Sequence, residues 1–223
     1  MKNLLNNMEK IKKNLGDSND AAVILNYINF VGEAEVLDLV SRFRVNKFVG
    51  RWEQVLTSIS TGLLGSGILY SSVNATYSLQ SDGNIKVVNA AYDQNFEKTC
   101  IEGSSRARSI LVPTCRTVTF NNSMFEGNYW IIYISQDFTT FIVSSPIIVG
   151  SIDISSNFGM YVLTKDREKF WNSSEPQNVF NALKKYGFTQ FWNFPVNSGK
   201  SFTLTDCSTK KKKSSRRKIR NKH

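Results

Sequence analysis

The sequence has 223 residues, a formal net charge of +10, 41% hydrophobic and 12% aromatic residues. This composition indicates a globular protein with a core and argues against a disordered chain. No apolar run approaches the roughly 20 residues that a membrane-spanning helix needs, and residues 1–20 lack the continuous apolar segment of a secretory signal. We therefore expect no membrane anchor. The compartment stays open, with the cell interior favoured over export.

The positive charge is concentrated at the C-terminus. Residues 208–223 contain nine basic and no acidic residues, which leaves +1 for residues 1–207. A run of this kind predicts a disordered arm that attracts an anionic membrane or nucleic acid, or that is simply solvated. It has no aromatic residues, so base-specific recognition is not expected. The candidate contact residues are Lys210, Lys211, Lys212, Lys213, Arg216, Arg217, Lys218 and Arg220.

Residues 1–42 are predicted to be a helical extension. Apolar residues recur at helical spacing in three segments, and Gly32 separates the second segment from the third. The favoured interpretation is a cap that packs on the following domain or is partly disordered. A helix pair that binds a specific partner is the alternative.

From Gly50 onward the apolar period changes to two, which is typical of β-strands. Residues 73–80 alternate, a Ser-Asp-Gly-Asn turn follows at 81–84, and residues 85–93 return, so this part predicts a hairpin. Further short strands follow at close spacing, which indicates a sandwich or barrel. Residues 61–71 are rich in glycine and apolar residues and would form a long first loop.

Three later strands are apolar on both faces, at residues 129–134, 141–143 and 160–163, so both faces need cover. A helix after the last strand would supply it. The sequence Ser-Glu-Pro-Gln at 174–177 has the form of a capping box, an apolar stripe follows, and Gly187 ends the helix.

Specific motifs in this pattern resemble the lipocalin family. Gly50-Arg51-Trp52, led in by residues 46–49, resembles the first lipocalin motif, although Glu53 replaces the usual tyrosine. Residues 73–92 resemble the second and third strands of the subgroup that contains apolipoprotein D and the bacterial lipocalins. In the second motif only Asp137 is kept, and at the third Lys165 replaces the usual arginine. Arg167 is a fallback for that position.

The resemblance implies a fold and a binding site. It implies an all-β protein: an eight-stranded antiparallel up-and-down barrel at residues 43–207, with one flanking C-terminal helix and the helical extension at 1–42. It also implies a closed end plugged by Trp52, with the Lys165 charge over its ring. Such a barrel can hold one small ligand. The expected ligand-contacting residues are Tyr77, Asn89 and Tyr161, with Tyr129, Ile131, Tyr133, Phe141 and Val143 added by strand alternation.

The three cysteines fit no metal-binding spacing. Free buried thiols in a reducing compartment are the favoured interpretation. The lipocalin resemblance implies a rival, one disulfide between the C-terminal segment and the barrel, with Cys100 and Cys207 as the preferred pair.

Non-covalent binding or transport of a small hydrophobic molecule, such as a fatty acid or lysolipid, is the expected function. The single histidine is His223 in the basic arm, which argues against Ser-His-Asp or Cys-His catalysis and against a histidine metal site. We therefore expect no enzyme activity, metal or cofactor. The alternative is an interaction protein whose barrel is a scaffold and whose basic arm binds anionic partners.

Overall fold

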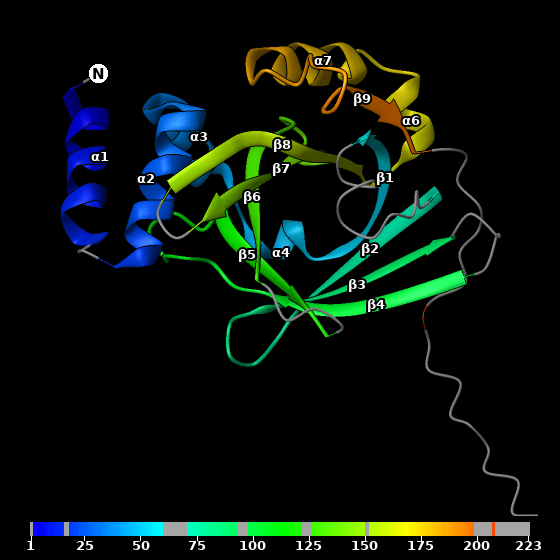
Figure 1. The fold of residues 1–223 in the computed structure, drawn as a ribbon, viewed down its shortest axis with the longest axis horizontal. Coiled ribbons are helices and arrows are strands. Elements are labelled where there is room, and N and C mark those ends of the chain that lie inside the picture. Colours follow the sequence, from blue (N-terminus) through cyan, green and yellow to red (C-terminus); the bar gives the residue numbers. More distant parts are fainter. Residues whose placement is uncertain are drawn as a thin grey trace, which may run out of the picture.

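A computed structural model describes residues 2–15, 18–59, 71–92, 98–121, 126–149, 152–198 and 207. The predicted first loop, apart from its last residue, and the basic arm at 208–223 lie outside these residues. The part that is described contains a β-barrel flanked by helices (Figure 1). The strands are β1 Gly50–Ser58, β2 Ser71–Leu79, β3 Ile85–Tyr92, β4 Lys98–Ser105, β5 Cys115–Phe120, β6 Gly127–Ile134, β7 Thr140–Val149, β8 Ile152–Thr164 and β9 Pro195–Asn197.

Eight of these strands close the barrel, as predicted. Each pairs antiparallel with the next in sequence, β8 pairs with β1, and β1 also pairs with β2. The short β9, which the sequence did not predict, adds to β1 at Leu56–Ser58. The turns at 80–84, 106–114 and 135–139 lie at one end of the barrel, which we call the closed end. The strands β1, β3, β5 and β7 end at the opposite end, which we call the open end.

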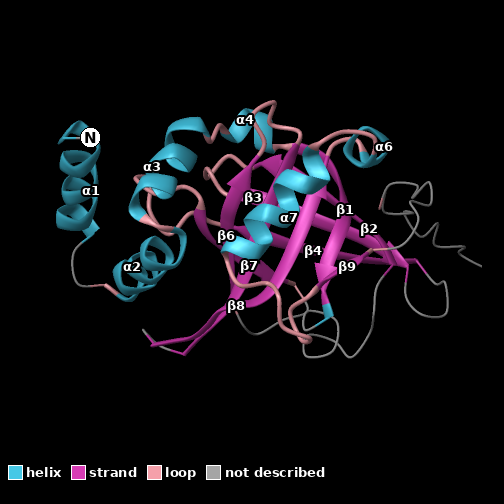
Figure 2. Cartoon of the chain, turned by 90° about the horizontal axis from the view of Figure 1, so that it is seen from above, coloured by secondary structure: helices cyan, strands magenta, loops and turns pink. Residues whose placement is uncertain are grey.

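The N-terminal extension forms helices, as expected, and it packs on the barrel. The helices are α1 Lys2–Leu15, α2 Asn19–Val31, α3 Glu33–Arg42 and the short α4 Val45–Phe48 (Figure 2). The Tyr27 ring on α2 lies 5.4 Å from the Trp130 ring on β6, and its hydroxyl donates to the Ile131 carbonyl at 2.7 Å. Asp20 at the start of α2 pairs with Arg106, at 2.9 Å, and with Arg108. Apolar and ionic contacts therefore both fix α2 against the wall.

This packing agrees with the favoured interpretation of residues 1–42 as a cap, and it adds a second cover to the one expected from the C-terminal helix. The outer face of β6 is covered by α2, and Phe30 of α2 lies 6.0 Å from Trp130 and 5.4 Å from Tyr186, ring centre to ring centre. Trp130 is fully buried as a result. A two-sided apolar strand indicates that a cover exists, but its spacing does not say which helix supplies it.

After β8 the chain forms two helices, α6 Arg167–Trp171 and α7 Glu175–Lys185. Pro176 lies in the first turn of α7, and Gly187 follows its end with a φ of 76°. Val179 and Leu183 are buried, but Phe180 of the predicted stripe is 39% exposed. The predicted capping-box bond is not formed, because Ser174 makes no side-chain cap. Instead the Ser173 hydroxyl accepts from the Glu175 amide at 3.1 Å.

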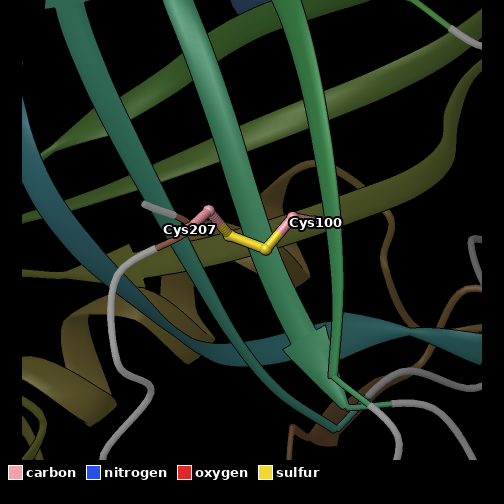
Figure 3. Close-up of a disulfide and its surroundings, with 2 residues drawn as sticks. All are labelled: Cys100 and Cys207. Atoms are coloured by element: carbon pink, nitrogen blue, oxygen red, sulfur yellow. A yellow bond between two sulfur atoms is a disulfide. The ribbon is translucent and has the colours of Figure 1, made fainter. Parts of the chain in front are cut away.

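Cys100 and Cys207 form a disulfide that joins the outer face of β4 to the segment before the basic arm (Figure 3). Cys115 is free and buried, and burial raises the pKa of its thiol. The free-thiol interpretation is therefore correct for Cys115 and wrong for the other two. Spacing alone does not show that residues 107 positions apart meet. Because disulfides persist in oxidising surroundings, this bond counts against a reducing intracellular compartment.

We predict that Trp52→Ala lowers the free energy of unfolding by about 3–5 kcal/mol, because it removes a fully buried ring from the closed end of the barrel. Urea denaturation followed by circular dichroism measures this loss. Trp171→Ala is the matched control, since Trp171 is 37% exposed and its removal should have a much smaller effect. Similar losses for the two variants would contradict the assignment of Trp52 to the core.

Candidate ligand-binding site

Four aromatic rings fill the closed end of the barrel, and we call Phe48, Trp52, Tyr77 and Phe141 the barrel floor. Phe141 lies 4.6 Å from Trp52 and 5.1 Å from Phe48, ring centre to ring centre, and Phe48 lies 4.7 Å from Tyr77. The Trp52 indole N–H donates to the Phe48 carbonyl at 2.8 Å, so the buried polar atom is satisfied. Short α4 positions Phe48, and the following Gly50 has a φ of 113°, which favours glycine. The floor limits how deep a ligand can reach.

Lys165 lies at the end of β8 beneath this floor. Its ammonium is 4.9 Å from the Trp52 ring centre and donates to the Lys47 carbonyl at 2.9 Å. The lysine therefore places a cation against the ring in spite of the missing guanidinium. Arg167, the fallback candidate, instead donates to the Gln54 carbonyl at 3.1 Å.

Asp137, the retained residue of the second motif, lies in the β6–β7 turn outside the barrel. Its carboxylate accepts hydrogen bonds from the Ser135 and Thr139 side chains and from the Thr139 amide, and it pairs with Lys169 at 3.3 Å. Desolvation by burial raises its pKa, but these bonds outweigh that effect and lower it to about 2. Asp137 thus organises the turn that leads into β7.

Tyr77 of the floor pairs with a second tyrosine, Tyr129 on β6. The Tyr77 and Tyr129 hydroxyls are 2.6 Å apart, and the side chains are 4% and 9% exposed. Burial raises the pKa of both phenols, so both are neutral at ordinary pH. One hydroxyl uses its proton in the shared bond, and the other keeps a proton that it can donate to a ligand.

The remaining calyx candidates lie on the inner wall. Ile131 and Val143 are cross-strand partners and fully buried, and Val143 is also the partner of Tyr161. Asn89 pairs with Ala75, the partner of Trp52, so its side chain is on the inner face. Its amide oxygen is buried and has no hydrogen-bond partner among the described residues. A buried oxygen of this kind suits a donor from water or a ligand.

Tyr133 is not part of this wall. An irregularity in the β6–β7 pairing between Ile131 and Tyr133 changes the alternation, so Tyr133 faces outward. Its hydroxyl donates to Glu175 on α7 at 2.9 Å and lines an outer cleft of about 830 Å³. Simple alternation assigned Tyr133 to the calyx because a bulge leaves no clear mark in the sequence.

The structure adds Arg116, which the sequence reasoning missed. It is on β5, its backbone partner is Tyr129, and it is only 3% exposed. Burial lowers the pKa of its guanidinium to about 10, so the group is still charged at neutral pH. The sequence did carry a signal for Arg116. A charged residue at an inward position of the alternating strand β5 indicates a polar group inside the barrel.

Comparisons with known proteins agree with this geometry. Residues 43–148 match the lipocalin-like domain family. This match assigns residues 43–148 to the lipocalin family. It is 30% identical to bovine apolipoprotein D over 93 residues, which are 40% of this chain and 45% of that protein. It is 26% identical to temperature-induced lipocalin-1 of Arabidopsis thaliana over 121 residues, 51% of this chain and 63% of the relative.

The chain thus spans roughly half the length of the curated relatives that it matches. Solved structures with a similar fold include lobster apocrustacyanin A1, with a TM-score of 0.54, and apocrustacyanin C1, with a TM-score of 0.55. Both are 13% identical and cover 74% of this chain and 87% of their own. Lipocalins are generally binding proteins without enzyme activity, and the barrel fold suits a small hydrophobic ligand.

We predict that Tyr77→Phe lowers the free energy of unfolding by about 1–3 kcal/mol, because the buried Tyr129 hydroxyl loses its partner. The double variant Tyr77→Phe/Tyr129→Phe should lose less than the sum of the two single losses. Urea denaturation of the four proteins gives the coupling energy. Tyr186→Phe, whose hydroxyl makes no hydrogen bond within the described residues, is the control. Strict additivity would contradict the observed pair.

Proposed function

We propose that this lipocalin binds a small hydrophobic molecule in the calyx, without catalysis. The observation that carries the proposal is an inner wall that combines apolar side chains with a few polar groups. Ile131 and Val143 offer apolar surface, while Asn89 and the Tyr77–Tyr129 pair offer directed hydrogen bonds. Apolar burial supplies most of the affinity of such a site, and the polar groups select and orient the ligand.

Single-chain lipids are the ligand class that this wall supports best. The calyx of an eight-stranded barrel is narrow, so one acyl chain fits it better than a large planar ring. We propose the ligand-contacting set as Tyr77, Asn89, Tyr129, Ile131, Phe141, Val143 and Tyr161. Phe141 belongs to the floor, and we expect it to touch only the deepest ligand atoms.

We expect a titration of the full chain with laurate to change tryptophan fluorescence saturably, with an apparent affinity that hardly changes between low and high salt, because apolar contacts dominate calyx binding. Ile131→Trp is the test variant, since the larger ring should occupy the calyx and weaken binding at least tenfold. Ile110→Trp is the matched control, because Ile110 is 93% exposed. No saturable response to fatty acids from 8 to 18 carbons would contradict the proposal.

A second candidate function is contact with an anionic membrane at the open end. The segment between α7 and β9 exposes Phe191, Trp192 and Phe194 by 81%, 43% and 53%. It leads into Pro195, which pairs with Ser58 at the open end of β1. Exposed aromatic side chains favour a membrane interface. Asn193 within this segment donates to the Asn157 carbonyl on β8 at 2.9 Å.

The disulfide fixes the residue that precedes the basic arm. Cys207 is bonded to Cys100, the third residue of β4, and β4 begins at the open end with Lys98. The nine cations that follow Cys207 in the sequence would attract anionic lipid. Exposed aromatic residues together with a basic run favour a membrane over nucleic acid as the anionic partner.

We predict that the chain co-sediments with vesicles containing 30% phosphatidylserine and less with pure phosphatidylcholine. Removal of residues 208–223 should abolish most of the salt-dependent part of this binding. Phe191→Ser/Trp192→Ser should weaken the part that persists at high salt, while Trp171→Ser, away from the mouth, should not. Equal binding to both vesicle types, or stronger binding to RNA than to vesicles, would contradict this candidate.

A further inference from the structure

Arg116 is a buried cation inside the barrel. Its backbone partner Tyr129 has its hydroxyl against Tyr77, so the three side chains lie inside the barrel toward its closed end. The Arg116 guanidinium donates three hydrogen bonds to neutral oxygens. Nε reaches the Ser105 hydroxyl at 3.0 Å, Nη2 reaches the Ser105 carbonyl at 2.9 Å, and Nη1 reaches the Pro113 carbonyl at 3.3 Å.

These bonds hold the guanidinium in place without neutralising it. A guanidinium has five N–H donors, so two remain. Within the described part of the chain, no carboxylate lies within ion-pair distance of Arg116. A buried charge without a counter-ion is costly, and such charges in proteins are normally paired.

Arg108 provides a comparison within the same molecule. Its side chain is 6% exposed, similar to that of Arg116, but it pairs with Asp20 and lies 3.8 Å from Glu126. Among the described residues, acids therefore pair with the buried arginine under α2, and none pairs with the one inside the barrel. The counter-ion of Arg116 is best supplied from outside the chain.

We propose that Arg116 binds the carboxylate of a single-chain fatty acid, which enters head first with its alkyl chain directed toward the open end. The inference rests on the proposed calyx function and names its ligand class and orientation. The two remaining N–H groups can bind the two carboxylate oxygens as a fork. The free proton of the Tyr77–Tyr129 pair adds a third donor. Ile131 and Val143 then contact the first methylene groups.

The geometry sets the direction of the ligand. Arg116 bonds Pro113 in the closed-end connection at 106–114, so a carboxylate bound to Arg116 lies toward the closed end of the calyx. Asn89 lies further along the inner wall. A ligand bound in the opposite orientation would place its alkyl end against Arg116. The guanidinium would then lose its hydration and gain no hydrogen bond in return.

The test compares laurate, 1-dodecanol and dodecylamine, which share a twelve-carbon chain and differ in the head group. Calorimetric titration of the full chain at pH 8 should show laurate binding about ten- to a hundredfold more tightly than dodecanol, and dodecylamine more weakly than both. This comparison uses the unaltered protein, so it does not depend on whether a variant folds. Equal affinity for laurate and dodecanol would overturn the inference but not the proposed function. No binding of any of the three would overturn both.

Arg116→Met tests the residue itself. It should weaken laurate binding about tenfold or more and leave dodecanol binding nearly unchanged, so that the preference for the acid disappears. Arg116→Lys keeps the charge without the fork and should retain part of the preference. Arg51→Met is the matched control, because Arg51 is exposed on the outer face of β1. Thermal unfolding identifies variants that are folded. A folded Arg116→Met protein that keeps the full preference for laurate would overturn the inference.

Discussion

The structure depends on the aromatic contact that closes one end of the barrel. Trp52 is held between Phe141 and the cation of Lys165, and its N–H bonds the carbonyl of Phe48. Through this one ring, the helical lead-in, the first strand, the seventh strand and the end of the eighth are joined. Strands that are distant in sequence must meet here for the barrel to close, so loss of the ring affects the whole wall.

The same contact fills one end of the barrel interior with aromatic rings. The rest of the inner wall carries polar groups among its apolar side chains. The aromatic rings of the floor fill the closed end, and the inner wall also presents the tyrosine pair, Arg116 and Asn89. A wholly apolar calyx would bind any hydrophobic molecule of the right size. Directed polar groups on an apolar wall instead discriminate among ligands by their head groups, because an unmatched buried group costs free energy.

The outer face of the barrel is held by contacts other than those of the floor. The helix α2 attaches through Tyr27, Phe30 and Asp20, so the extension is part of the core. The disulfide attaches Cys207, the residue before the basic arm, to β4. The two proposed contacts, one inside the calyx and one with a membrane, would differ in their response to salt.

The sequence by itself determined the barrel, its strand order, the plugging tryptophan and the lysine that replaces the usual arginine. These features can be predicted from the period of the apolar residues, from turn-forming residues and from short motifs, because all three are properties of the local sequence. Only the tertiary structure decided which helix covers β6, that Cys100 meets Cys207, that Tyr133 turns outward at a bulge, and that Arg116 is inside without an acid. Each depends on contacts between distant segments or on a shift of register, and neither leaves a periodic signal in the chain.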